Sequence, residues 1–276
     1  MQALLLGKQR ELLRTLGARA GADVLFLKAA WADPVLYGGV GRRLGSDVDV
    51  LVPADRFEAM TAALIDEGFN VVRPEHRRVT HHLGAKEWTF VHAGPWMPVD
   101  LHRDLADAPW FDVDVPGLFA RARDWTAERE MIRSLGPEDQ VVHAAVHYAN
   151  HLYDLDGRHA DDIARLAERE PLDWTAVFER AQRGGFRLPL VLLGAQLAVR
   201  GVTMPTPPWA HAPAMQARTF AVRRWVLQRD GVRRRRGVTA WRGTLLERPL
   251  LSDRWTALPR WLARWAGLRA LDALAR

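Results

Sequence analysis

The chain has 276 residues, enough for one large domain or two of ordinary size. With 48% hydrophobic and 26% charged residues it has the composition of a folded globular protein, which excludes an intrinsically disordered one. The formal net charge is +6, and there are no cysteines, which excludes a disulfide framework, a zinc-thiolate site and a cysteine nucleophile.

The first 20 residues combine leucines with charged side chains such as Lys8, Arg10 and Glu11. They therefore predict an amphipathic helix and lack the uninterrupted apolar core of a signal peptide. No stretch of the chain approaches the roughly 18 apolar residues of a membrane span. We expect a cytoplasmic protein with no stable membrane association.

Strand and helix signals alternate up to about residue 102. The apolar residues 24–27 predict a strand, residues 37–46 form a glycine-rich loop, and the alternating residues 47–52 predict a second strand. A helix is expected over residues 53–67, closed by Gly68. Further short strands are predicted at residues 71–72, 88–92 and 97–102. This order implies a mixed β-sheet with helices on one side.

After about residue 124 the sequence becomes helical in character. Helices are predicted at residues 137–153, 160–167, 173–183 and 188–199, with more beyond the prolines at 205–208. The expected fold class is α+β. A head of mixed sheet and helices would occupy residues 1–124, and an all-helical, substrate-binding domain with a basic C-terminal region would occupy residues 125–276.

The sharpest chemical feature is residues 45–50, Gly-Ser-Asp-Val-Asp-Val. Strand side chains alternate, so Asp47 and Asp49 point to one face while the valines pack into the core. Two such carboxylates repel unless a cation lies between them, and the glycine-serine turn before them can bring backbone N–H groups to a phosphate. Asp100 repeats the pattern at the centre of Val-Asp-Leu-His. Three carboxylates on neighbouring strands suit magnesium and two-metal phosphoryl transfer, although Asp-x-Asp alone is also typical of a solvated strand edge.

Several segments together resemble the DNA polymerase β-type nucleotidyltransferase superfamily, and more narrowly its bacterial branch with a helical C-terminal region. The branch pattern is a strand ending in Leu-Lys-Gly, an arginine before Asp-x-Asp-x-Leu-Val, then Gly-Phe, and a later Asp-Leu-His. One departure is Ala29, where the branch usually has glycine, which would place a methyl group at a backbone turn near the triphosphate. The matching segments are Leu27-Lys28-Ala29, Arg43, Asp47 to Val52, Gly68-Phe69 and Asp100-Leu101-His102, with weaker similarity to about residue 185.

The resemblance implies a polymerase β-type head and a nucleotidyltransferase that uses two magnesium ions. One ion would bridge the triphosphate of a nucleoside triphosphate (NTP) and the Asp47/Asp49 pair. The second would join Asp100 and an acceptor hydroxyl, which would attack the α-phosphorus and release pyrophosphate. ATP is the default NTP, and the residues that would bind it are Lys28, Arg43, Gly45 and Ser46.

The acceptor is the most open part of this interpretation, with a small-molecule hydroxyl as the leading hypothesis. Residues 201–276 hold 15 arginines against four acidic residues, a local balance of +11 that includes the run Arg233 to Arg236. Such a region can bind RNA or be a solvated surface. The alternatives are therefore a toxin-like enzyme that modifies RNA or protein, or a nucleotide-binding protein without turnover. The presence of all three carboxylates argues against a protein without turnover. That alternative stays open because Ala29 departs from the branch pattern.

Three other patterns are expected to be structural. Asp112 and Asp114 copy the Asp-x-Asp spacing, but no glycine-rich loop precedes them and Pro116 follows at once, so they predict a connecting segment. Asp161 and Asp162 are expected to cap a helix start. Three histidines recur every four residues and so share a helix face, where they predict core or cleft-lining side chains, since a metal site would lack an acidic ligand. They are His143, His147 and His151.

Overall fold

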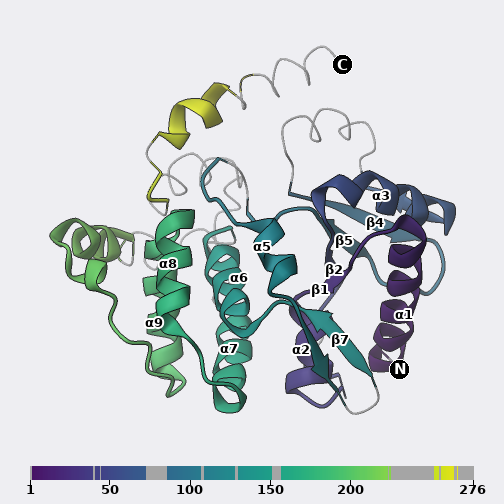
Figure 1. Ribbon diagram of the computed structural model, residues 1–276, viewed down its shortest axis with the longest axis horizontal. Helices are drawn as coiled ribbons and strands as arrows, with labels where there is room; N and C mark the ends of the chain where they lie inside the picture. The colour runs from purple at the N-terminus through teal and green to yellow at the C-terminus, as the bar shows by residue number, and fades with distance from the viewer. Residues whose placement is uncertain are drawn as a thin grey trace. The chain divides into compact units, whose positions relative to one another are not determined.

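The chain divides into two compact units in a computed structural model (Figure 1). A sheet unit comprises residues 1–105 and 114–136, and a helical unit comprises residues 106–113 and 137–276. The structure describes residues 2–39, 41–43, 45–72, 86–106, 109–127, 130–150, 157–222, 224, 252–254, 256–263 and 266. The arginine run 233–236 and His151 lie outside these residues.

A mixed five-stranded sheet forms the centre of the sheet unit. Its strands are β1 (Leu25–Phe26), β2 (Val48–Leu51), β3 (Phe69–Val71), β4 (Glu87–His92) and β5 (Val99–His102). The strand order is β1-β2-β5-β4-β3, with β2 and β5 parallel and the other neighbouring pairs antiparallel. The mixed sheet predicted from the sequence is therefore confirmed.

Two amphipathic helices pack beside this sheet (Figure 1). They are α1 (Gln2–Ala20) and α3 (Phe57–Asp66), the latter preceded by a 3₁₀ turn, η1 (Ala54–Arg56). α1 packs on α3, and α3 packs on β3 and β5, because both helices carry apolar residues at helical spacing. α3 is closed as predicted by Gly68, whose φ of +96° lies in the left-handed region that favours glycine. The buried side chains of these two helices include Leu6, Leu13, Leu16, Phe57, Met60 and Leu64.

Three features of the sheet unit were not predicted: two helices and a β-hairpin. Helix α2 (Lys28–Leu36) directly follows β1, and residues 29–36 are all buried, so it has no polar face from which a helical period could be read. It also contains Pro34, which is rare inside helices. The unit also contains α5 (Val115–Ala120) and a hairpin of β6 (Arg123–Thr126) and β7 (Met131–Ser134). β6 buries only Trp125, and one of the two buried residues of β7 is the polar Ser134, so neither strand has a clear alternation of apolar and polar residues.

The helical unit follows the sequence prediction closely. Its helices include α6 (Pro137–Asn150), α7 (Arg158–Arg169), α8 (Trp174–Gly184), α9 (Arg187–Val199) and the 3₁₀ turn η3 (Pro208–His211), and residues 213–222 are also helical. α6 packs on α7, α8 and α9. α8 begins at Asp173, whose side chain accepts a hydrogen bond from Ala176 N at 3.1 Å. In the described part of the chain, no helix is long and apolar enough to cross a membrane.

Candidate active site

Asp49 and Asp100 lie side by side on the parallel strands β2 and β5. Their Cα atoms are register partners, and partner residues on adjacent strands project to the same face of a sheet. Asp47 lies two residues before Asp49, and its pKa is affected by the charges of both Asp49 and Asp100. The structure thus brings together the three carboxylates named from the sequence. Their role as metal ligands remains a prediction.

Asp49 is the most tightly held of the three carboxylates. It is 2% exposed, and its Oδ1 atom accepts a hydrogen bond from Lys28 Nζ at 2.5 Å. His102 Nε2 lies 3.0 Å from the same oxygen. Burial alone would raise the pKa of Asp49, but the hydrogen bonds and charges of His102 and Lys28 hold it well below the usual range. Asp49 is therefore ionised at any pH near neutrality.

The other two carboxylates are less well compensated. Burial raises the pKa of Asp47, and the charges of Asp49 and Asp100 raise it further. Burial also raises the pKa of Asp100, although its Oδ1 accepts a hydrogen bond from Thr89 Oγ1 at 2.6 Å. Lys28 donates to Asp49, and the other two carboxylates lie close enough to like charges for those charges to raise their pKa values, so an added cation would be stabilised there.

Two groups on β4 support the site and were not found from the sequence. Glu87 and Thr89 are the register partners of His102 and Asp100. Glu87 Oε2 lies 3.0 Å from His102 Nδ1 and accepts a hydrogen bond from Lys86 Nζ at 2.5 Å. The approach of Nδ1 to Glu87 is close enough for an ion pair but lacks hydrogen-bond geometry. The period-two alternation of β4 was the sequence signal that could have placed Glu87 and Thr89 on one face of the sheet.

His102 thus lies between two carboxylates, Asp49 and Glu87. Burial would raise the pKa of Glu87, but the charges of His102 and Lys86 lower it. Contacts at both ring nitrogens restrict the orientation of the His102 imidazole, and the imidazole in turn restricts the orientation of the Asp49 carboxylate. The outer-shell partners of metal ligands act in the same way. His102 is therefore placed to orient Asp49.

Lys28 has an unusual backbone conformation at the start of α2. Its φ is +45°, and no other described non-glycine residue has a positive φ. The neighbouring Ala29 is buried inside the first turn of α2, where alanine is favoured. The left-handed residue is therefore Lys28, and alanine at position 29 needs no unusual backbone. Strained residues of this kind gather at functional sites.

The glycine-rich loop passes close to the start of α2 before it reaches Asp47. A Cβ atom at Gly45 would lie 3.3 Å from Ala29 Cβ and 3.2 Å from Asp47 O, so a larger residue would shift the loop. Arg43 is buried, with 6% of its surface exposed, whereas Ser46 is exposed. Of the residues predicted to bind the NTP, Arg43, Gly45 and Ser46 lie on the segment that leads into the carboxylates, whereas Lys28 lies at the start of α2. Their role in binding stays a prediction.

The donor chemistry of the site fits a divalent cation of the magnesium type. Carboxylate oxygens are the ligands that magnesium prefers. The pKa values of Asp47 and Asp100 are raised first by burial and then by neighbouring carboxylates, whose repulsion a bound cation would offset. Among the described residues, no group of three or more histidine, aspartate or glutamate side chains is already spaced as a metal site. At Asp49 both hydrogen-bonding contacts fall on Oδ1, where Lys28 provides positive charge.

The aspartates expected to be structural have individual partners. Asp112 accepts a hydrogen bond from Arg254 NH2 at 2.7 Å. Asp114 is the N-cap of α5 and accepts a hydrogen bond from Gly117 N at 3.0 Å. Neither contact involves the carboxylates of β2 and β5.

The start of α7 differs from the prediction that Asp161 and Asp162 cap it. The N-cap is Gly157, with φ +68°, so both aspartates lie inside the helix. Asp161 accepts a hydrogen bond from Arg200 Nε at 2.5 Å, and Asp162 is buried. The expectation failed because the helix begins three residues earlier, at Arg158.

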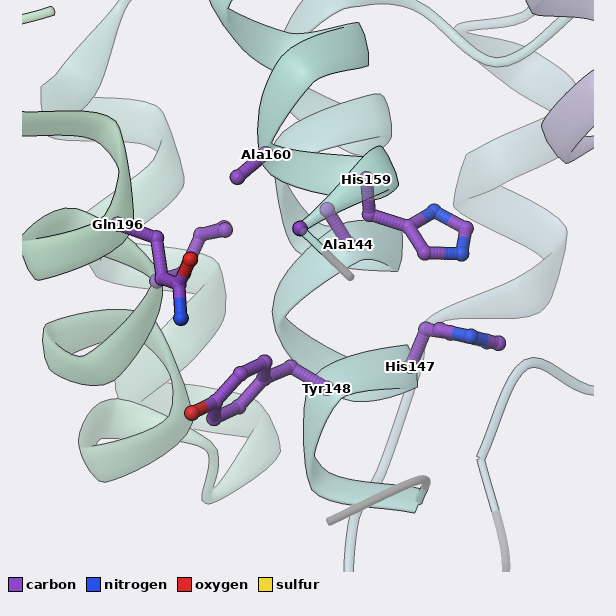
Figure 2. Close-up of a pocket in the computed structure, with 8 residues that line it drawn as sticks. Ala144, His147, Tyr148, His159, Ala160 and Gln196 are labelled. Atoms are coloured by element: carbon purple, nitrogen blue, oxygen red, sulfur yellow. The ribbon is translucent and has the colours of Figure 1, made fainter. Parts of the chain in front are cut away.

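Histidines gather between α6 and α7 in the helical unit (Figure 2). The ring centroids of His147 and His159 are 4.0 Å apart, and that of His143 lies 6.2 Å and 6.4 Å from them. His147 and His159 line a small pocket with Tyr148 and Gln196 (Figure 2). The described histidines are not spaced as a metal site.

Comparison with known proteins identifies a family. A search of curated proteins finds no match. Among solved structures, the chain is similar to the lincomycin-bound lincosamide antibiotic adenylyltransferase LnuA, with 17% identity, a TM-score of 0.41, and coverage of 59% of this chain and 97% of that chain. It is also similar to the antibiotic-resistance factor ANT(2'')-Ia, with 13% identity, a TM-score of 0.44, and coverage of 73% and 95%. Residues 1–200 match the model of a family described as "Uncharacterised nucleotidyltransferase". Because this match extends over most of the chain, the protein belongs to that nucleotidyltransferase family, in agreement with the polymerase β-type resemblance of its sequence.

Proposed function

We propose that this nucleotidyltransferase moves a nucleoside monophosphate from an NTP, ATP by default, to a hydroxyl group of a small molecule and releases pyrophosphate. Asp47, Asp49 and Asp100 would hold two magnesium ions. The observation that carries the proposal is the register of Asp49 beside Asp100, with Asp47 two residues upstream. An excess of carboxylate charge at the end of a glycine-rich loop suits the binding of a metal and a triphosphate together.

Each side chain has a separate part in this proposal. When bound, magnesium would neutralise the phosphates and lower the pKa of the acceptor hydroxyl. His102 orients Asp49 through the contact at Oδ1. Lys28 Nζ donates to the same oxygen and would add positive charge for the phosphates. Catalysis would rest on positioning and charge neutralisation, as in other phosphoryl transfers.

The NTP would lie against the loop that carries Arg43, Gly45 and Ser46. Gly45 lets the backbone pass close to α2, and the exposed Ser46 can offer its hydroxyl or its N–H group to a phosphate. Arg43 would add a guanidinium, whose planar donors match phosphate oxygens.

The test is incubation of the purified protein with each α-labelled NTP, magnesium and cell extract, followed by fractionation into small molecules, RNA and protein. The proposal expects magnesium-dependent pyrophosphate release and label in the small-molecule fraction. Asp47→Asn should abolish both, whereas the matched Asp-x-Asp control Asp114→Asn should keep them. Label in RNA or protein would favour the alternative acceptors. Absence of pyrophosphate release with every NTP would favour a nucleotide-binding protein without turnover.

A further inference from the structure

Asp33 gathers four backbone N–H groups of the glycine-rich loop. It lies in α2 and is 1% exposed. Its Oδ1 accepts a hydrogen bond from Arg43 N at 2.9 Å, and its Oδ2 accepts one from Gly41 N at 3.1 Å. Its main-chain oxygen accepts from Tyr37 N at 3.1 Å and Gly39 N at 2.9 Å. One residue therefore binds the loop at four successive odd positions.

This loop needs such an anchor because its own backbone is permissive. Gly38, Gly39 and Gly41 have φ values of +78°, +67° and +77°, in the left-handed region where glycine has no steric penalty. A glycine-rich segment has many accessible conformations, and its ordering costs backbone entropy. A buried carboxylate requires hydrogen-bond donors, which here come from the loop. The glycine-rich loop can adopt many conformations, and Asp33 selects the one in which the loop N–H groups satisfy its buried carboxylate.

The consequence falls on Arg43. The hydrogen bond from its own N–H group fixes its backbone, and so fixes the point from which the buried guanidinium extends. Two residues later, Gly45 lies against Ala29 of the same helix. α2 therefore holds the loop on both sides of Arg43, through Asp33 before it and Ala29 after it.

We propose that Asp33 is a positioning residue for nucleotide binding, which sets the glycine-rich loop so that Arg43 meets the triphosphate. The inference rests on the proposed function of the site. Asp33 touches neither the carboxylate cluster nor any reacting atom in this scheme. Its loss should therefore weaken NTP binding and leave the chemical step nearly unchanged.

The test compares Asp33→Asn with wild type in two measurements. Asparagine keeps one acceptor oxygen and presents an NH2 group to the second amide, so one of the two side-chain bonds is lost. Hydrogen exchange of residues 37–46 should accelerate by about tenfold or more, while that of β5 stays unchanged. The KM for the NTP should rise about tenfold, the loss expected for one charge-assisted contact, with kcat within about threefold.

A matched control separates positioning from simple loss of stability. Asp253, in the helical unit, has a side chain that is 7% exposed, and it also accepts a backbone N–H, from Arg187 at 3.2 Å, besides its ion pairs. Asp253→Asn should lower stability without changing the KM for the NTP. If Asp33→Asn does not fold, Gly41→Ala disturbs the loop from the other side, because alanine is strained at φ +77°. It should give the same KM increase with nearly constant kcat.

The outcomes for Asp33 and for the proposed function can be told apart. If wild type shows no transfer, the proposed function fails, and the Kd of the NTP replaces KM in the comparison. A weakened Kd together with faster loop exchange would then still support Asp33 as a positioning residue. Unchanged exchange, or faster exchange with an unchanged KM or Kd, would overturn the inference. A fall in kcat at constant KM would overturn it as well.

Discussion

Replacement of Lys28 by methionine isolates the ion pair at the centre of the site. The substitution removes the ammonium group and keeps an unbranched apolar side chain of similar length. Asp49 is 2% exposed and the side chain of Lys28 is 17% exposed, so the pair is shielded from water. After the substitution, Asp49 keeps only His102 on Oδ1. The variant should therefore bury an under-compensated charge.

The expected magnitude follows from the geometry. At the 2.5 Å separation of Nζ and Oδ1, the Coulomb attraction is about 7 kcal/mol at an effective dielectric constant of ~20, before desolvation is subtracted. Removal of one partner of a buried pair destabilises proteins by about 3–5 kcal/mol. Because His102 remains, we expect the lower end, about 3 kcal/mol. Asp49→Asn should destabilise for the same reason, and the double variant should show a coupling of about 2 kcal/mol.

The assay is the free energy of opening of the sheet unit, from native-state hydrogen exchange of β2 and β5 amides. The exposed Lys8→Met serves as the control and should change that free energy by less than about 0.5 kcal/mol. The pKa of Asp49 is lowered from its ordinary value of 3.8, and that of Lys28 is raised from 10.5. The coupling should therefore stay constant between these two values and be lost only toward more acidic or more basic pH. If the effects of Lys28→Met and Asp49→Asn on the free energy of opening add up in the double variant, the two residues are not coupled and the reasoning is refuted.

Three further predictions concern charged and titratable side chains. Asp47→Asn should abolish transfer yet stabilise the metal-free protein at pH 7 by up to about 1 kcal/mol, because it removes a like charge. Since the pKa of Asp47 is raised, this gain should fade as pH falls through the folded pKa toward 3.8, which a pH series of urea unfolding would check. His102→Gln should weaken magnesium binding or transfer by about 10–100-fold, measured by titration and by pyrophosphate release, since outer-shell partners have effects of this size. Replacement of Arg233 to Arg236 by glutamine should leave the transfer rate unchanged. A marked loss of transfer with a flattened salt dependence would instead indicate an RNA acceptor.

The parts of the fold that could be predicted are those in which a local pattern has a single interpretation. The alternation in residues 47–52 predicted β2, which extends over Val48–Leu51. Asp47 directly precedes this strand, so its common face with Asp49 stays a prediction. α2 was missed because burial on all sides removes the polar face that marks a helix in sequence. β2 is buried throughout, yet its β-branched residues and its alternation of valine with aspartate still marked it as a strand.

The surroundings of the carboxylates were harder to predict because they depend on strand pairing. Glu87 contacts His102 only because β4 lies beside β5 in a particular register. Asp33 binds the loop through backbone amides, which carry no sequence signature. The neutralisation of Asp49 by Lys28 likewise depends on the left-handed turn at Lys28, which a residue other than glycine rarely adopts.

The parallel pairing of β2 with β5 also bears on how the site forms in time. Asp49 and Asp100 are separated along the chain by α3, β3 and β4, and become neighbours only when the β2–β5 ladder closes. Such non-local pairings form slowly, because loop closure must precede the contacts that reward it. A cation that needs both carboxylates can stabilise only chains in which this pairing is complete. Magnesium should accordingly slow unfolding of the sheet unit and leave its folding rate almost unchanged.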